Sequence, residues 1–253
     1  MKSFGLVSVV MANYNEDLYI GDAIQSVLNQ TYNEFELIIV DDNSTDNSLK
    51  IINKYKQYDS RIILIQNKIN LGSGNSRNRG ISMAKGNYIT FLDSDDLWSF
   101  DKLGLHLNFM VLKKAKISHS NYGYIIDDVI LKKHFKVSKK LIGYNEILKR
   151  TEMSCLTTIY NCGEIGKHFM SEDRRKQDYS LWLNILKLGF KSLPFNQVTG
   201  YYRINKKEKK QNIFKKYFSH YYFLRENQGL SIIKSHIYSM SWFKNAIFRY
   251  INL

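Results

Sequence analysis

YITFLDSDDLW, at residues 88–98, is a short apolar strand that runs directly into three acids. Apolar residues without polar alternation are expected where both faces of a strand are buried in a parallel sheet. Asp93, Asp95 and Asp96 then fall within four positions. Like charges this close would be driven to neutralise if buried, unless a cation lies between them, and Mg²⁺ or Mn²⁺ prefers carboxylates together with phosphates. A solvated acidic turn is the alternative interpretation of the same spacing.

Strand and helix patterns alternate along the first hundred residues. Apolar runs predict strands at 6–11, 35–40, 62–66 and 88–92, with helices between them at 20–28, 49–55 and 76–83. Ser44 or Asp46 is expected to cap the second helix. The alternation predicts an α/β fold with a Rossmann-like, mostly parallel sheet and helices on both faces. Asp41 and Asp42 follow the second strand, so both acidic groups should lie at the carboxyl edge of the sheet, where such folds bind ligands.

The pattern changes after residue 98. A helix capped by Ser99 is expected to run to about Lys114 and to bury Leu103, Leu107, Met110 and Val111. Strands at 117–126 and 129–137 around an Asp127–Asp128 turn predict a small antiparallel insertion, and a further strand is expected at 155–160.

A second long helix is expected over 178–188. Asp178 stands at its start and Gly189 is its stop. Its inward stripe is Leu181, Trp182, Ile185 and Leu188.

The net charge of the 253-residue chain is +14, and it is unevenly distributed. From Arg203 onward, 11 Lys and Arg stand against 2 Glu, so this part carries +9. A basic segment favours an anionic partner, either nucleic acid or an anionic membrane surface. The aromatic residues among these lysines suit helices that lie on an anionic leaflet. Helices that pack on the rest of the protein, with solvated lysines, explain the pattern equally well.

The cysteine count and the hydropathy bear on location. Two cysteines, Cys155 and Cys162, favour a reducing compartment, so a cytoplasmic protein is expected. The apolar run at 4–12 is too short and too broken for a membrane span, and no later stretch approaches the roughly 20 apolar residues that a span requires.

Three acidic sites, Asp41–Asp42, Asp93–Asp96 and Asp178, suit a nucleotide-diphosphate donor. One strand-end acid can accept from a base N–H or a ribose hydroxyl, the middle cluster can hold a divalent metal on the diphosphate, and a third carboxylate can deprotonate an incoming hydroxyl. The ring of Tyr14, at the end of the first strand, either stacks on a base or belongs to the core.

The glycines at 72 and 74 match neither the dinucleotide fingerprint nor the P-loop. Their loop is instead expected to let Arg77 and Arg79 approach the donor. A surface salt bridge is the alternative for each arginine, and it is the favoured one for Arg79.

Several blocks of sequence, in order, resemble glycosyltransferase family 2. They are VSVVMANYN at 7–15, SVLNQTY at 26–32, FELIIVDDNSTD at 35–46, NLG at 70–72, SRNRGI at 76–81, AKGNYITFLDSDD at 84–96 and QDYSLWL at 177–183. The resemblance is dense over about the first hundred residues. It implies the GT-A fold, a nucleotide-sugar donor and a divalent cation, Mn²⁺ or Mg²⁺.

The resemblance also implies roles for single residues. The implied donor-binding set is Ala12, Asn13, Tyr14, Asp42, Arg77, Asp93, Ser94 and Asp96. Within that set, Asp42 would contact the base and the ring of Tyr14 would stack on the base. Outside that set, Asp95 would be the metal ligand of the D-x-D motif. Asp178 would be the catalytic base. Gln177 stands where the family usually has a glutamate, which leaves the neighbourhood of the base less defined.

The implied activity is that of an inverting, metal-dependent hexosyltransferase. It would move a sugar from a nucleotide-diphosphate donor, with UDP as the expected nucleotide, to a hydroxyl of a glycan or an undecaprenyl-diphosphate-linked glycan. The implied pathway is the synthesis of a surface polysaccharide such as O-antigen or capsule, by analogy with similar short transferases. A processive polymerase is not expected, because no second transferase domain follows.

The expected organisation is a GT-A catalytic domain at 1–204 with a basic, aromatic helical extension at 205–253. Residues 1–100 would form the nucleotide-sugar half and 101–204 the acceptor half. The extension is the candidate for peripheral contact with the inner face of the cell membrane. A non-catalytic nucleotide-sugar-binding protein is one alternative, although it would usually have lost the base. A nucleic-acid-binding protein is the other, but no nucleic-acid partner is expected, because such a protein would not need the acidic clusters.

Overall fold

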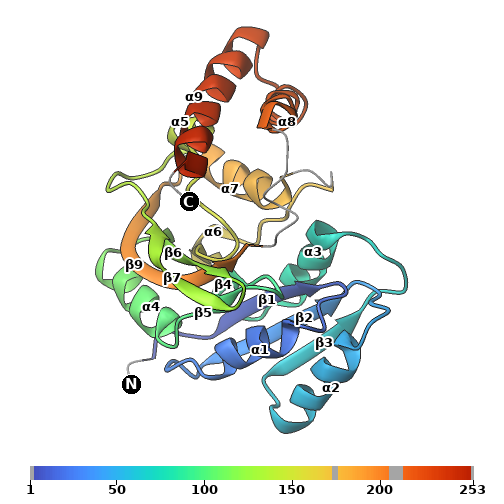
Figure 1. Cartoon of the computed structure of the whole chain (residues 1–253). Coiled ribbons are helices and arrows are strands. Elements are labelled where there is room, and N and C mark those ends of the chain that lie inside the picture. Colours follow the sequence, from blue (N-terminus) through green and yellow to red (C-terminus); the bar gives the residue numbers. More distant parts are fainter. Residues whose placement is uncertain (1–2, 173–175, 205–212, 252–253) are drawn as a thin grey trace.

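The computed structural model describes residues 3–172, 176–204 and 213–251. In this part of the chain the strands form one mixed sheet, flanked by helices (Figure 1). In sheet order the strands are β3 (Ile62–Gln66), β2 (Phe35–Asp41), β1 (Val7–Asn13), β4 (Tyr88–Phe91), β8 (Ile159–Asn161), β6 (Ile117–Ile126), β9 (Ser192–Arg203) and β5 (Leu97–Trp98), and β7 (Val129–Phe135) pairs with β6.

Strands β1 to β4 form the parallel half of the sheet. β1 runs parallel to both β2 and β4, and β2 runs parallel to β3. All seven residues of β1 and of β2 are buried, which is why these strands are continuous apolar runs. The carboxyl ends of β2 and β4 therefore lie at the same edge of the sheet, as the sequence predicted.

Helices cover both faces of the sheet. They are α1 (Ile20–Leu28), α2 (Ser48–Tyr58), α3 (Ser73–Met83), α4 (Lys102–Leu112), α5 (Tyr144–Lys149), α6 (Cys162–Ile165), α7 (Gln177–Lys187), α8 (Ile213–Glu226) and α9 (Ile232–Ile251). Apolar residues of α1, α2 and α4 belong to one core cluster, and those of α3 and α7 belong to the other. The expected α/β architecture is confirmed.

The second half of the chain continues the same sheet. The predicted hairpin is present, since β6 and β7 pair in antiparallel fashion. It is not a separate insertion, because β6 also pairs with β8 and runs parallel to β9. The strand expected at 155–160 begins only at Ile159. The segment before it turns instead, because the Ser154 carbonyl accepts from the N–H groups of Thr157 and Thr158.

Of the two predicted helix caps, the one at Ser99 is wrong, whereas Asp46 does bond the first N–H of α2. α4 begins at Lys102, and the hydroxyl of Ser99 donates to the Thr199 carbonyl instead of capping the helix. α2 begins at Ser48 without a side-chain cap at its N-cap residue, although Asp46 accepts from the Ser48 N–H.

Two residues predicted to face inward are exposed. Val111 lies in the last turn of α4, and its exposed fraction is 38%. Leu188 lies just beyond the last residue of α7, and its exposed fraction is 63%. Gly189 follows with φ +94°, a left-handed conformation that suits the predicted helix stop.

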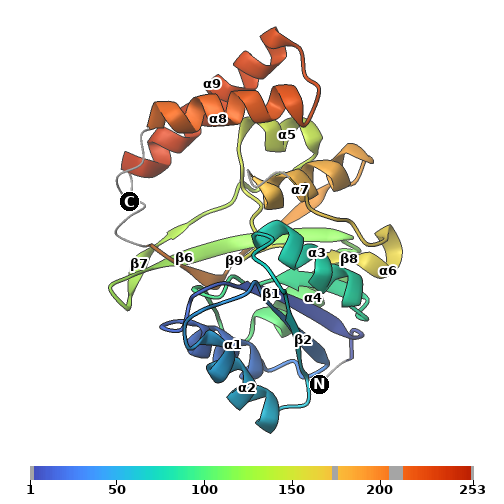
Figure 2. The same ribbon diagram turned by 90° about the vertical axis from the view of Figure 1, so that its right-hand side faces the viewer.

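The extension forms a helical hairpin that packs on the rest of the protein. Figure 2 shows α8 and α9 beside α5 and α7. Phe223 and Leu224 of α8 are buried in the same core cluster as Trp182 of α7, so the packing alternative is confirmed for the inner face. Residues 205–212, where the extension was predicted to start, lie outside the described residues. In the described part of the chain, no helix is both long enough and apolar enough to span a membrane.

Candidate active site

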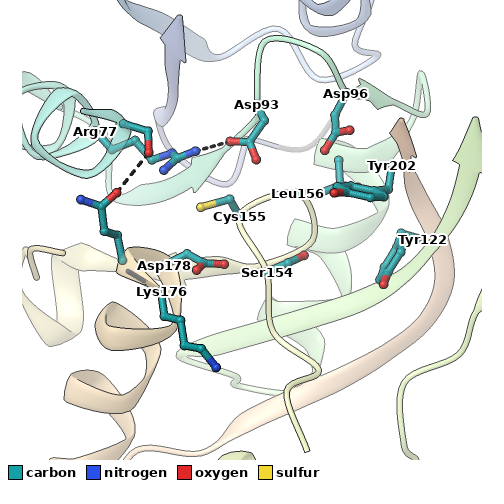
Figure 3. Close-up of a pocket in the computed structure, with 12 residues that line it drawn as sticks. Arg77, Asp93, Asp96, Tyr122, Ser154, Cys155, Leu156, Lys176, Asp178 and Tyr202 are labelled. Carbon is teal, nitrogen blue, oxygen red and sulfur yellow. Dashed lines mark hydrogen bonds and ion pairs between the residues drawn. The ribbon is translucent and has the colours of Figure 1, made fainter. Parts of the chain in front are cut away.

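One pocket, of about 390 Å³, brings the C-terminal side of β4 together with the start of α7 (Figure 3). Its lining comes from α3, the acidic turn after β4, β6, β9, the turn before β8 and the start of α7. The lining residues are Ser73, Arg77, Asp93, Asp96, Tyr122, Ser154, Cys155, Leu156, Lys176, Gln177, Asp178 and Tyr202.

Arg77 and Asp93 form an ion pair at one end of this pocket. The guanidinium Nη2 lies 2.5 Å from Asp93 Oδ1, and the Arg77 side chain is only 11% exposed. Burial acts to lower the pKa of Arg77, but the Asp93 carboxylate opposes this and the net effect is a raised pKa. Arg77 is therefore a permanent positive charge inside the pocket. Arg79 points elsewhere and bonds the side chain of Asn67.

Asp96 is the buried member of the acidic turn. Its Oδ1 accepts from the Arg203 N–H at 2.8 Å, whereas its buried Oδ2 has no hydrogen-bond partner among the described residues. Burial raises the pKa of Asp96 well above its usual value, and the neighbouring charges of Asp93 and Asp95 raise it further. A buried oxygen without a donor, beside two more carboxylates, fits a hard cation that prefers oxygen ligands.

The protein alone does not complete a metal shell there. Within residues 3–172, 176–204 and 213–251, no group of three or more His, Cys, Asp or Glu side chains is arranged to hold a metal ion. The acidic turn could thus contribute only part of the ligands of an ion. Ser94, between the acids, is 5% exposed.

Asp178 lies in the first turn of α7 and lines the pocket. Burial raises the pKa of its carboxyl group, and Asp93 raises it further, while Arg77, the Tyr179 N–H and Lys176 act in the opposite direction. The Tyr179 N–H donates to Asp178 Oδ1 at 2.7 Å. A carboxylate with a raised pKa at a pocket wall is suited to accept a proton.

Gln177 joins α7 to α3. Its Oε1 accepts from the Gly74 N–H at 2.8 Å and from the Ser73 hydroxyl at 3.1 Å. A Cβ added to Gly74 would collide with the Gln177 amide. The amide thus has a structural role at the position where the family usually has a glutamate.

Asp41 and Asp42, at the end of β2, are both buried and lie outside the pocket lining. Asp41 accepts from the Asn13 amide and from Ser44. Asp42 accepts from Asn67 and from the N–H groups of Leu71 and Gly72. Both carboxylates therefore already hold loops at the sheet edge, and any contact of Asp42 with a base would add to these bonds.

The end of β1 carries the other predicted donor residues. Ala12 and Asn13 are buried, and Tyr14 is 47% exposed, so its ring is not part of the core. The buried Asn13 Oδ1 has no hydrogen-bond partner in the described part of the chain. It is an acceptor at the sheet edge that could receive an N–H from a ligand.

Sequence reasoning missed the other end of the pocket. Tyr122 of β6 and Tyr202 of β9 stand there with Leu156, opposite Arg77 (Figure 3). Their ring centres are 6.3 Å apart. No local signal marked either residue, because each is one of two tyrosines in a strand of the sheet.

Arg203 was also missed as a positioning residue. Its Nε donates to the Asp95 carbonyl at 2.8 Å, and its guanidinium lies over the Tyr19 ring and pairs with Asp128. The end of β9 thus holds the acidic turn in place.

Comparison with known proteins is consistent with this site. The sequence model of glycosyl transferase family 2 matches residues 8–175. The chain belongs to glycosyltransferase family 2. The resemblance seen in the sequence is therefore confirmed, and this family 2 chain is a glycosyltransferase.

A curated relative of this family 2 chain is a glucosyltransferase. The Escherichia coli protein WfaP, named UDP-Glc:alpha-D-GlcNAc-diphosphoundecaprenol beta-1,3-glucosyltransferase, is 41% identical over 210 residues, which is 83% of this chain and 82% of WfaP.

Two solved structures resemble this family 2 chain in fold. TarS 1–349 from S. aureus in complex with UDP-GlcNAc has a TM-score of 0.66 at 20% identity, covering 90% of this chain and 69% of TarS. The mannosyltransferase PcManGT from Pyrobaculum calidifontis, in complex with GDP-Man and Mn²⁺, has a TM-score of 0.66 at 14% identity, covering 93% of this chain and 70% of PcManGT. At these identities the likeness concerns the fold, and the predicted GT-A fold is confirmed.

Proposed function

We propose that this glycosyltransferase moves a sugar from a UDP-sugar to a hydroxyl of an undecaprenyl-diphosphate-linked glycan, with inversion, in the assembly of a bacterial surface polysaccharide. The observation that carries the proposal is the position of Asp178, in one pocket with Asp96 and the Arg77–Asp93 pair. The name of WfaP supports a UDP-sugar donor and a lipid-linked acceptor. UDP-glucose is therefore the first donor to test.

The donor would lie along the carboxyl edge of β1, β2 and β4. The exposed ring of Tyr14 would stack on the base. Asp42, and Asn13 Oδ1, which has no partner in the described part of the chain, would accept from a base N–H. Asp93 would contact the ribose and the donor sugar. Ala12 and Ser94 would line the donor site between the base and the sugar.

Asp95 is the proposed protein ligand of Mn²⁺ or Mg²⁺, and Asp96 Oδ2, which has no partner among the described residues, lies in the same turn. A bound divalent cation would neutralise charge on the departing nucleoside diphosphate. Arg77 contributes a further positive charge to the pocket. PcManGT, which has a similar fold, was solved with Mn²⁺.

Asp178 is the proposed catalytic base. Its carboxylate would take the proton from the acceptor hydroxyl while that oxygen attacks the anomeric carbon and the bond from this carbon to the diphosphate breaks. A single displacement of this kind inverts the anomeric centre. The acceptor sugar would pack on Tyr122 and Tyr202, at the end of the pocket opposite Arg77.

A panel of UDP-sugars with Mn²⁺ tests the proposal, with release of UDP as the readout. The variant Asp178→Asn keeps the size of the side chain but cannot accept a proton. We expect UDP release to fall by at least about 100-fold, with unchanged affinity for UDP and Mn²⁺. Asp22→Asn, on the exposed side of α1, is the matched control. Wild-type turnover in Asp178→Asn would remove the residue from the base role, and a wild type inactive on every UDP-sugar would contradict the proposal.

We also propose that the outer face of the α8–α9 hairpin docks on an anionic membrane. This face consists of Phe214, Phe218 and Tyr222 on α8 and Ile233, Ile237 and Met240 on α9, with exposed fractions of 47–72%. Spacings of three or four residues put each set on one side of its helix. Lys215, Lys234 and Lys244 are exposed nearby. Apolar side chains beside lysines suit an anionic leaflet, and the chain's +14 charge disfavours a second copy as the partner.

Flotation with vesicles that contain phosphatidylglycerol tests this docking. We expect the wild type to float, and the triple variant Phe218→Ser, Ile233→Ser, Ile237→Ser to remain unbound. The control is Leu18→Ser, Tyr58→Ser, Ile69→Ser, which removes equally exposed apolar residues elsewhere. Equal flotation of the two triple variants would contradict the proposed surface.

A further inference from the structure

The α8–α9 hairpin contacts the lining of the pocket at Lys176. Lys176 lines the pocket beside Asp178, but its ammonium group points away from that carboxylate (Figure 3). Its Nζ lies 2.5 Å from Nδ1 of His220 on α8 and 4.5 Å from the ring centre of Trp242 on α9. The ring centre of Tyr179 on α7 is 5.9 Å away. These three rings, called here the Lys176 cage, come from three different helices.

The cage suits a positive charge. The His220 and Trp242 rings stack with centres 4.6 Å apart, and aromatic faces attract cations. Burial lowers the pKa of His220 well below its ordinary value, and the charge of Lys176 lowers it further, so His220 is neutral. Its Nδ1 then accepts the hydrogen bond from the ammonium group, which leaves the ring proton on Nε2.

Lys176 also has an unusual backbone. Its φ of 51° and ψ of 44° are left-handed, a conformation that residues other than glycine rarely adopt and that persists when the surroundings hold it. The next two residues are Gln177 and Asp178, and the Lys176 carbonyl accepts the Ser180 N–H at 2.9 Å. The direction in which α7 starts, and with it the place of Asp178, depends on this residue.

We propose that the α8–α9 hairpin contributes to the active site, because it holds the side chain of Lys176, and Lys176 in turn positions Asp178. The inference rests on the proposed role of Asp178 as the base. Lys176, His220 and Trp242 are positioning residues in this scheme. They act through Asp178 and need not touch the reacting atoms.

The sign of the electrostatic effect follows from the groups around Asp178. Those that face it are Arg77 from α3, Asp93 from the acidic turn, Cys155 from the turn before β8, and Lys176 and the Tyr179 N–H at the start of α7. The Lys176 ammonium group itself lies among the three cage rings, close enough to Asp178 for that charge to act on it, and burial lowers the pKa of Lys176 to about 7. Removing the positive charge of Lys176 raises the pKa of Asp178. Because the proposed base must be ionised, enzyme activity is then lost at a higher pH as the pH is lowered.

The experiment measures kcat/KM for UDP release, from about pH 5.5 to about pH 9, in neutral and charge-keeping variants. For Lys176→Met we expect the acidic limb of the profile to move to higher pH, by more than the difference between the wild-type and control profiles. Lys176→Arg keeps the charge and should restore most of the wild-type profile. Lys176→Gln repeats the neutral test if the methionine variant folds poorly. Affinity for UDP and Mn²⁺ should stay within about twofold, because these substitutions do not change the residues of the proposed donor site.

Variants of the hairpin separate positioning from general stability. Trp242→Leu removes the largest ring of the cage and should move the limb in the same direction as Lys176→Met. Ile232→Leu, at the exposed start of α9 and outside the docking face, is the matched control and should leave the profile unchanged. A uniform loss of activity at every pH, with an unmoved limb, would overturn the inference while leaving the proposed function intact. A wild type without UDP-sugar turnover would instead contradict the proposed function, and this inference with it.

Discussion

At the scale of single residues, hydrogen bonding separates the acids that hold structure from those that remain open to a ligand. Asp41 and Asp42 accept bonds from loops at the sheet edge. Asp96 keeps one buried oxygen without a donor in the described part of the chain. Leaving a buried carboxylate oxygen unpaired costs free energy, so this oxygen of Asp96 marks a position where a bound cation would offset that cost.

Asp95→Ala tests the acidic turn. Loss of the proposed metal ligand should weaken binding of UDP in the presence of Mn²⁺ by at least about tenfold, which is about 1.4 kcal/mol. Binding of UDP without metal should change little. Isothermal titration calorimetry measures both affinities, and Asp22→Ala on α1 is the control. An unchanged Mn²⁺-dependent affinity would argue that Asp95 does not hold the ion.

At the scale of elements, the site depends on how α3 and α7 meet. Their first turns touch where the Gln177 amide bonds Gly74 and Ser73. These elements are about a hundred residues apart in sequence, and they bring Arg77 and Asp178 into one pocket. Arg203 performs a comparable task for the acidic turn, because it joins that turn to the end of β9.

Gly74→Ala tests the contact between the two helices. The new methyl group would collide with the Gln177 amide, which must move and give up its hydrogen bonds. We expect the free energy of unfolding to fall by about 1–3 kcal/mol, as measured by denaturant titration. Combining it with Gln177→Ala should recover part of this loss.

The matched control is Gly21→Ala in the first turn of α1, where a new Cβ would lie 3.8 Å from its nearest neighbours. There the substitution should raise stability by up to about 1 kcal/mol, because alanine favours the helix. Equal effects of the two substitutions would show that the Gly74 site is not crowded.

At the scale of the whole molecule, the hairpin is continuous with the catalytic core. Phe223 and Leu224 are 1% and 0% exposed, and they share a cluster with Phe91 and Trp182. The division into a domain at 1–204 and an extension at 205–253 remains a proposal. It describes a difference in composition more than a difference in packing.

Truncation after residue 204 tests this continuity. Removing Phe223 and Leu224 would open the core, so we expect the free energy of unfolding to fall by at least about 3 kcal/mol. The outer-face variant Phe218→Ser, Ile233→Ser, Ile237→Ser should differ from the wild type by less than about 1 kcal/mol, because its residues are exposed. A truncated chain as stable as the full chain would contradict the prediction. Flotation should for this reason use outer-face variants and not the truncated chain.

Much of the fold could be predicted because its signals are local. Burial on both faces makes β1 and β2 continuous apolar runs, and helical spacing marks α1 and α7. Strand ends that share an edge of a parallel sheet then bring the acidic groups together without any knowledge of side chains. The family resemblance rests on the same short blocks.

The partners of individual side chains could not be predicted in this way. The amide of Gln177 on Gly74, the ammonium of Lys176 between His220 and Trp242, and the pairing of Tyr122 with Tyr202 all join residues 44 to 103 positions apart. Periodicity and residue type report whether a side chain is buried, but not what it meets, because that depends on how the elements pack. Composition likewise marked the hairpin as basic and aromatic, and only its packing showed that one face belongs to the core and that its rings hold the residue beside Asp178.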